Sequence, residues 1–279
     1  MVTAKPPIKK ELESIPKRRR WSALDGFAIT MLFMYVGFLA SLVIADFAYV
    51  RPSEFFKIWQ STDLRHAIRL SLITTSCSAM LSLIFAIPVG YALSRYRFPG
   101  IRVMDMIADI PLIVPHLVMG LSLLVFFQTA PGRLIESTGL RFVYTPAGIV
   151  LAQFTVVSAF AVRAMKAAFD SIDPRMENVA RTLGWSKPQA FLRVTLPVAR
   201  NGILAAAIFA WAQALGLFGP LLVFAGTTRQ KTEVMATSIY LELSVGRIET
   251  ALAISMIMIA IAFVSLWLFK RLASGGYLW

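Results

Sequence analysis

The feature that most constrains this chain is a series of long apolar runs separated by short polar and basic stretches. Only 15% of the 279 residues are charged, whereas about 25% are charged in an average soluble protein. A helix needs about 20 apolar residues to cross a bilayer, and the runs approach or reach that length. The sequence therefore predicts an all-α membrane protein with six transmembrane helices: Phe27–Ala45, Leu70–Leu93, Ile107–Phe127, Pro146–Val162, Gly202–Ala225 and Thr250–Phe269.

Three of these runs contain residues that disrupt helices. Non-helical backbone inside a membrane is tolerated where neighbouring helices or a water-filled cavity satisfy its polar groups. The interruptions therefore suggest a bundle with an internal path, although kinks are also ordinary in membrane bundles. The interrupting residues are Pro88 and Gly90 in the second run, Pro111 and Pro115 in the third, and Gly216, Gly219 and Pro220 in the fifth.

The net charge of +13 would suit a nucleic-acid partner, but the basic residues lie in the gaps between apolar runs. Counted by loop, 19 lysines and arginines fall on one side of the predicted membrane and 9 on the other. Cytoplasmic loops are enriched in these residues, which predicts that both termini are cytoplasmic. Residues 1–26 then form a basic cytoplasmic tail and residues 27–279 the transmembrane domain, with its first helix retained rather than cleaved.

The cysteine and histidine residues predict neither a disulfide nor a metal site. Cys77 is the only cysteine and has no partner for an intrachain bridge. His66 and His116 are far apart in the sequence and belong to no metal-binding motif, so helix-end or interfacial positions are expected for both.

The loop at about 163–201 differs from the other loops because it has a helical pattern of its own. Asp173 and Pro174 are typical of a helix start, and Gly184 is typical of a helix end. Ser186 is expected to cap a second short helix. The first helix carries an apolar stripe at i, i+3, i+4 and i+7, made of Met176, Val179, Ala180 and Leu183. The second has an apolar side with Phe191 and Val194, and Pro197 closes the segment.

This pattern predicts a compact helix–turn–helix with an exposed apolar stripe on the cytoplasmic side. Such a stripe needs a partner. It either packs under the bundle of its own chain or docks as a short helix into a groove on another protein. The pattern alone does not choose between them.

The same loop resembles the "EAA" loop of the permease subunits of ATP-binding-cassette importers. That motif is Glu-Ala-Ala, three residues, Gly, nine residues, and Ile-x-Leu-Pro. Here Asn178 and Val179 depart from the first two positions, Glu177 lies next to them on another helix face, and Val194 stands for Ile. The resemblance assigns coupling to an ATPase to Glu177, Asn178, Val179, Ala180, Gly184, Val194, Leu196 and Pro197.

Further matches extend the resemblance over residues 65–270, namely Leu70–Ser71, Ile87–Ser94, Arg97–Gly100, Ile110–Pro115 and Gly120–Leu121. The resemblance implies a transport subunit of the bacterial inner membrane, not an enzyme. Its implied partners are a pair of cytoplasmic ATP-binding subunits, a second permease copy or homologue, a periplasmic or lipid-anchored solute-binding protein and membrane lipid, without nucleic acid. No Gly-Lys pair occurs in the chain, so ATP and Mg²⁺ belong to the partner subunit and this chain holds no cofactor.

The resemblance is strongest to the molybdate, tungstate and sulfate class, through Gly216–Gly226, Thr237–Glu242 and Gly246. Polyamine and iron or thiamine permeases share parts of this pattern, and Leu217 stands where many relatives carry an acidic residue. Small polar side chains in the spans suit an oxyanion or a neutral solute better than a polycation. The candidate path residues are Pro115, Ser122, Gln153, Thr155, Ser158, Gln213, Gly216, Gly219 and Ser255, although such side chains also bond to neighbouring helices.

Two other function classes fit the sequence less well. An ion-coupled secondary transporter needs ionisable groups within its spans, and only Asp109 qualifies, near a helix end. A membrane enzyme needs a catalytic constellation, and neither a Ser-His-Asp nor a His-Glu-x-x-His arrangement is present.

Overall fold

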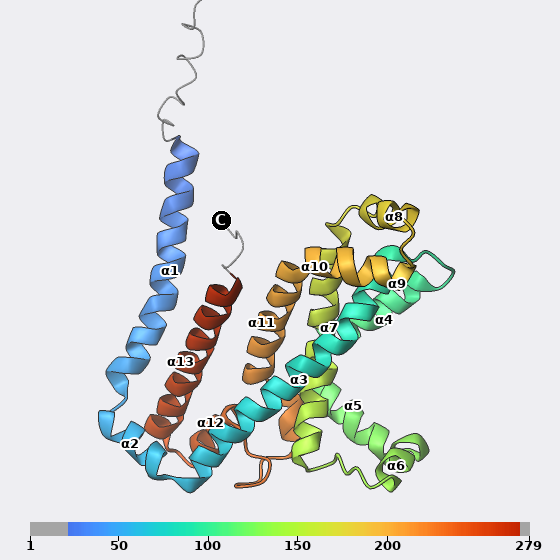
Figure 1. Cartoon of the computed structure of the whole chain (residues 1–279). Coiled ribbons are helices and arrows are strands. Elements are labelled where there is room, and N and C mark those ends of the chain that lie inside the picture. The colour runs from blue at the N-terminus through green and yellow to red at the C-terminus, as the bar shows by residue number, and fades with distance from the viewer. Residues whose placement is uncertain (1–21, 274–279) are drawn as a thin grey trace, which may run out of the picture. The chain divides into compact units, whose positions relative to one another are not determined.

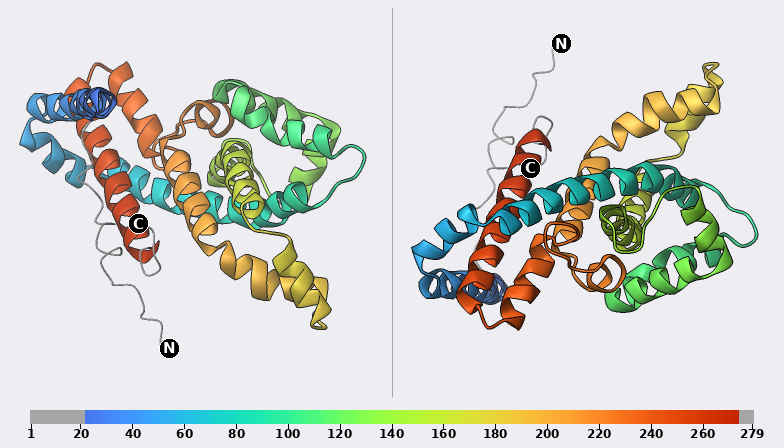
Figure 2. Two further views of the ribbon diagram at one scale, coloured as in Figure 1. Left: turned by 90° about the horizontal axis from the view of Figure 1, so that it is seen from above. Right: turned by 90° about the horizontal axis from the view of Figure 1, so that it is seen from below.

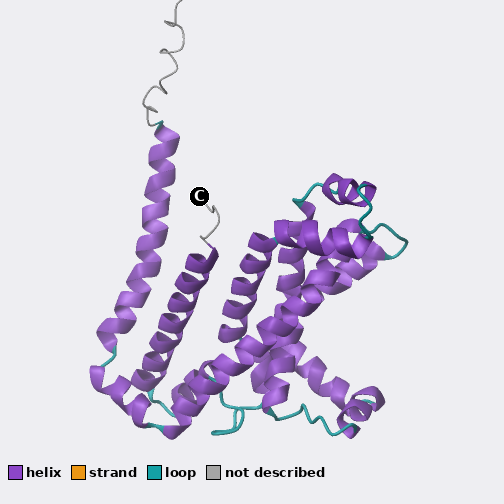
Figure 3. Ribbon diagram, viewed as in Figure 1, coloured by secondary structure: helices purple, strands orange, loops and turns teal. Residues whose placement is uncertain are grey.

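The computed structural model describes residues 22–273, and every regular element within them is helical (Figure 3). The basic tail ahead of Ser22, which contributes to the predicted orientation, lies outside the described residues. The chain divides into two compact units at Tyr49 and Val50. The first unit contains a single described helix, α1 (Ala23–Tyr49), none of whose residues is buried within the chain.

The second unit is a helical bundle whose elements are shown in Figure 1. Its helices are α2 (Pro52–Gln60), α3 (Thr62–Arg95), α4 (Ile101–Ile113), α5 (His116–Gln128), α6 (Ala130–Ser137), α7 (Pro146–Asp170), α8 (Arg175–Thr182), α9 (Lys187–Ala190), α10 (Leu196–Val198), α11 (Arg200–Gly216), α12 (Met235–Ser244) and α13 (Ile248–Ala273), with two π-helical turns, η3 (Phe191–Thr195) and η4 (Leu221–Ala225).

Four described helices are long and apolar enough to cross a membrane: α1, α3, α7 and the Ile248–Phe269 part of α13. Two bent pairs raise this number to six if each pair counts as one span. One pair is α4 and α5, with a bend of 112° between them. The other is Lys187–Val198 and α11, with a bend of 69°.

Two of the predicted interruptions of the spans are wrong. Pro88 and Gly90 lie inside α3, which continues without a break, and Pro111 lies inside α4. The third span breaks only at Val114 and Pro115. The fifth is also not one helix, because α11 ends at Gly216 and the chain resumes as the π-helical turn η4.

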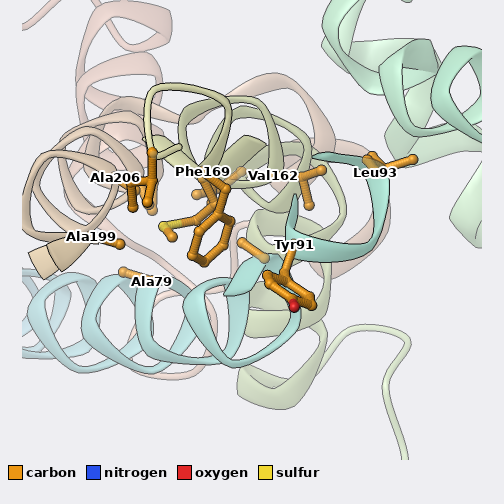
Figure 4. Packing of buried hydrophobic residues seen from close by; sticks show 14 residues of the cluster. Ala79, Tyr91, Leu93, Val162, Phe169, Ala199 and Ala206 are labelled. Carbon is orange, nitrogen blue, oxygen red and sulfur yellow. The ribbon is translucent and has the colours of Figure 1, made fainter. Parts of the chain in front are cut away.

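The core lies where α3, α7 and α11 pack together, and Figure 2 shows α7 end-on between its neighbours. Small side chains allow the close contact: Ala79 and Ala86 on α3 and Ala206, Ala210 and Ala214 on α11 are buried against α7 (Figure 4). Larger side chains such as Phe169 and Met165 fill the remaining space. Because lipid is as apolar as these side chains, van der Waals packing rather than removal from water stabilises this contact within a membrane.

Candidate functional site: the loop helices between α7 and α11 and the interrupted spans

The predicted helix–turn–helix is present between α7 and α11. Helix α7 continues beyond the expected end of the fourth span to Asp170, so the loop begins at Ser171. The Asp173 carboxylate accepts a hydrogen bond from the backbone N–H of Arg175 at 2.9 Å, but α8 begins at Arg175, so the predicted N-cap at Asp173 is displaced by one residue. Pro174 occupies the N-cap position, one residue earlier than expected.

Gly184 ends α8 in a Schellman motif. The N–H of Gly184 donates to the carbonyl of Arg181 at 3.1 Å, and the N–H of Trp185 donates to the carbonyl of Ala180 at 3.2 Å. This pair of bonds requires a left-handed residue after the helix, and Gly184 has φ +92°. The predicted helix stop is therefore confirmed, with a geometric reason for glycine.

The second half of the loop is one continuous helical path through α9, η3 and α10. The backbone N–H of Ser186 donates to the side-chain oxygen of Gln189 at 2.9 Å, which supports the predicted start at Ser186. Pro197 does not close the segment as predicted but lies within α10. Because proline has no N–H, the path widens before it: the N–H of Leu196 donates to the carbonyl of Phe191 in a π-type bond, and the bend into α11 follows at Ala199.

The apolar stripe on α8 is exposed at three of its four positions. Met176, Val179 and Leu183 are 43%, 59% and 75% exposed, whereas Ala180 faces inward. Leu192 on η3 adds a further exposed apolar side chain. Both α8 and α9 project from the α3–α7–α11 core (Figures 1 and 2), so this apolar edge is available to a partner.

The remaining residues assigned to coupling occupy different environments. Asn178, Gly184 and Pro197 are exposed, Val194 and Leu196 are partly buried, and Glu177 is buried. The Glu177 carboxylate is bonded within the chain, to Tyr91 and Thr195. The loop thus presents one edge outward and is fixed to its own bundle along the other.

The candidate path residues separate into two groups, and the breaks in the third and fifth spans form the first. Pro115 is the N-cap residue of α5, and Gly216 ends α11. A Cβ atom added to Gly219 would lie 3.1 Å from the backbone nitrogen of Leu117, and one added to Gly120 would lie 2.6 Å from the Cα of Pro220. The two interrupted segments therefore contact each other backbone to backbone.

The second group consists of polar side chains that bond within the bundle. Gln153 accepts a hydrogen bond from Ser78 Oγ at 2.8 Å and donates to the carbonyl of Ala214 at 3.0 Å, near the end of α11. Thr155 and Ser255 donate to carbonyls of their own helices. Ser122 is exposed, and Ser158 and Gln213 are partly buried.

A charged cluster on α4 and α7 was missed by the sequence analysis, which singled out Asp109 alone. The Arg163 guanidinium bonds to Asp109 and to Asp105 Oδ1, the latter at 2.9 Å, and Lys166 Nζ lies 3.5 Å from Asp105. The i, i+4 spacing of the acids and the i, i+3 spacing of the bases could have revealed it. Because the carboxylates are paired with cations, Asp109 does not have the environment of a free ion-coupling group.

A second polar site lies at the opposite end of the bundle from α8. A pocket of about 320 Å³ is lined by the buried carboxylates of Glu54 and Glu242, by Lys57 and by two arginines. Glu242 pairs with Arg229 at 2.8 Å and Arg247 at 3.4 Å. The hydrogen bond from Lys57 lowers the pKa of Glu54 below its ordinary value.

Beside this pocket, Glu233 is fully buried, and only one of its two carboxylate oxygens has a hydrogen-bond partner, the Ser238 hydroxyl at 2.7 Å. Burial raises the pKa of Glu233 above its ordinary value, and the bond from Ser238 opposes that shift in part.

Comparison with known proteins gives a consistent family. Residues 82–275 match the model of the binding-protein-dependent transport system inner membrane component. The molybdenum transport system permease protein of Escherichia coli K12 is 32% identical over 211 residues, covering 74% of this chain and 92% of the relative. The sulfate transport system permease protein of the same organism is 26% identical, covering 90% of this chain and 94% of that protein.

A molybdate/tungstate transport system permease protein of Thermococcus kodakarensis is 38% identical over 159 residues, or 57% of this chain, and the matched part spans only 60% of that protein. Among solved structures, a bacterial importer of alginate has a TM-score of 0.74 at 18% identity, covering 90% of this chain and 94% of that chain. A methionine importer has a TM-score of 0.61 at 18% identity, covering 75% of this chain and 94% of that chain. These two likenesses establish the shared fold.

Proposed function

Because the chain belongs to the family of binding-protein-dependent transport system inner membrane components, we propose that it is the permease subunit of an ATP-binding-cassette importer. The observation that carries the proposal is the family match over residues 82–275, which includes the whole of the α8–α10 loop. The relatives named above are transport system permeases, which agrees with this role. ATP hydrolysis then takes place on a separate subunit.

The exposed edge of α8 is the proposed docking surface for that ATPase subunit. Met176, Val179 and Leu183 line one side of a short amphipathic helix, which is the form a helix takes when it seats in a groove. Asn178 and Gly184, two further coupling residues, are also exposed on this helix and at its end. Movement of the ATPase subunit is then passed to the bundle as a rigid-body displacement of this loop.

We further propose six spans with both termini in the cytoplasm, each bent pair of helices counting as one span. The four long helices and the two bent pairs supply that number. An even number of crossings agrees with the distribution of lysine and arginine. A reporter that works only in the cytoplasm should be active when it is fused after Trp279. Activity of a reporter that works only after export would contradict the topology.

For the solute we propose an oxyanion such as molybdate, tungstate or sulfate; polyamine, iron and thiamine permeases are the alternatives. The names of the most similar relatives support this class. The polar side chains of the candidate path residues are amides and hydroxyls, and such groups suit an anion better than a polycation. We expect weak binding of the solute to the permease alone, with selectivity supplied by a solute-binding protein.

The test is uptake of molybdate into proteoliposomes that contain the permease, its ATPase subunit and its binding protein. We expect uptake that requires ATP and all three components. Sulfate or tungstate should inhibit molybdate uptake to the extent that each binds to the binding protein. Uptake driven by a proton or sodium gradient without ATP would refute the importer. Uptake of a polyamine in place of molybdate would refute the solute class alone.

A further inference from the structure

The Glu177 carboxylate lies at the centre of a buried cluster that joins the loop to the end of α3. Glu177 is in the first turn of α8 and is only 7% exposed. Its Oε2 accepts a hydrogen bond from the Tyr91 hydroxyl at 2.8 Å, and its Oε1 accepts one from the Thr195 hydroxyl at 2.6 Å. The Nε atom of Arg95 lies 3.7 Å from Oε1. A buried carboxylate is unfavourable unless such partners surround it, so these contacts have to form together.

The partners of Glu177 come from two places that the chain connects only distantly. Tyr91 and Arg95 are four residues apart and share one face of α3, whereas Thr195 is on η3 in the second half of the loop. The cluster therefore fixes α8 against η3 and also against α3. The chain leads from the loop directly into α7 and α11 but not into α3, so Glu177 supplies a connection that the backbone does not.

The end of α3 is in turn fixed to α7. Ser94 Oγ donates to Asp170 at 2.6 Å, and an Nη atom of Arg95 donates to the carbonyl of Ile172 at 2.8 Å. A Cβ atom added to Gly90 would lie 2.8 Å from the Cβ of Met165, so α3 and α7 are in backbone-level contact at this depth. A displacement of the end of α3 is thus shared with α7.

Tyr91 connects the cluster to the core. Its ring packs edge-on against Phe169 of α7 at 5.6 Å and against Phe191 of η3 at 4.7 Å between ring centroids. Figure 4 shows this ring beside the core cluster with its hydroxyl directed away from Phe169. One side chain therefore contacts the loop through its oxygen and the core through its ring.

We propose that Glu177 is a positioning residue that transmits displacement of α8 to α3, through Tyr91 and Arg95, rather than a residue that contacts the ATPase subunit. This inference rests on the proposed function. It predicts that breaking the cluster leaves the ATPase bound, because the docking edge of α8 is on the other side. The movement of the docked helix would then no longer reach α3, and ATP would be hydrolysed without transport.

The test measures molybdate transported per ATP hydrolysed in proteoliposomes containing the complete complex. Tyr91→Phe removes only the hydroxyl that bonds to Glu177, and Tyr96→Phe makes the same change at the residue that follows the end of α3, as a control. Hydrogen bonds to charged groups are strong, so we expect Tyr91→Phe to lower the ratio by about fivefold or more while ATPase association is kept. Tyr96→Phe should match the wild type.

A second pair of variants separates transmission from stability. Thr195→Val removes the other hydroxyl and should lower the ratio, whereas Thr195→Ser keeps the hydroxyl and should restore it. The wild-type ratio in both Tyr91→Phe and Thr195→Val would overturn the inference. If Tyr91→Phe does not assemble, the Thr195 pair decides alone. Failure of the wild-type permease to bind the ATPase would instead overturn the proposed function.

Discussion

The left-handed conformation of Gly184 allows a test of the loop that is matched for backbone strain. Gly184 has φ +92° and Gly100, in the loop before α4, has φ +93°. No atom lies within 4 Å of a Cβ added to either residue, so substitution by alanine causes strain at both positions without a steric clash. An L-residue in this region costs about 1–2 kcal/mol, and the two alanine variants should be destabilised to a similar degree.

Of these two left-handed positions, only Gly184 is in the Schellman motif that ends α8. A change of 1–2 kcal/mol alters an equilibrium by a factor of about 5–30. We therefore expect Gly184→Ala to lower molybdate uptake by up to that factor, because the native turn at Trp185 becomes less populated. Gly100→Ala should keep uptake close to the wild type. Gly184→Asn should retain more uptake than Gly184→Ala, since asparagine enters the left-handed region more readily.

The assay compares membrane abundance, the midpoint of thermal unfolding of the purified permease, and uptake for all three variants. The reasoning requires similar abundance and similar midpoints for Gly184→Ala and Gly100→Ala, with different uptake. Equal uptake by these two variants would show that the geometry of this turn does not matter for transport.

Three further predictions follow from contacts elsewhere in the chain. Val179→Asp places a charge on the exposed edge of α8 and should reduce co-purification of the ATPase without changing permease abundance. Ala180→Asp, at a buried position, should also lower permease abundance. Equal co-purification of the ATPase with Val179→Asp and with wild type would exclude this docking edge. Gly90→Leu forces α3 away from the Met165 backbone and should destabilise the bundle by about 1–3 kcal/mol, seen as a lower unfolding midpoint; an unchanged midpoint would contradict the close packing. Because burial raises the pKa of Glu233, its protonation stabilises the folded state below the unfolded pKa of about 4.3, and this contribution is lost as the pH rises through the folded pKa. Glu233→Gln should flatten the fall of the unfolding midpoint with rising pH. Glu249→Gln, at a partly exposed position in the first turn of α13, is the control, and equal slopes for Glu233→Gln and wild type would refute the assignment.

The sequence predicted the loop well because its signals are local. The start signal at Asp173 and Pro174 and the stop at Gly184 act within one helical turn, and the structure has the start displaced by one residue and the stop as predicted. The stripe on α8 was predicted at four positions and is exposed at three, since the pattern cannot show that Ala180 turns toward the rest of the loop. Glu177 is buried, unlike its neighbour Asn178, and its partner Tyr91 is 86 residues away in the sequence, beyond the reach of any local pattern.

The spans were predicted less well, because hydropathy reports the length of an apolar run but not its direction. Pro88 was expected to interrupt α3 and does not, while Pro115 marks a bend of 112° between α4 and α5. Both prolines lack an N–H, so the difference arises from packing around them rather than from the residue type. Gly90 likewise does not break α3; its lack of a side chain allows the close contact with Met165 of α7.

The breaks in the third and fifth spans lie next to each other, where α5 contacts η4 and the turn before it. A side chain at Gly120 would collide with the backbone of Pro220, and one at Gly219 would crowd the backbone of Leu117. Non-helical backbone at membrane depth has to be covered by protein or face water. An opening between α5 and η4 would uncover the turn at Leu217–Pro220, so we expect the two segments to move together during transport. A path that includes Pro115 and Gly216 would then open along one side of this paired unit and not through its middle.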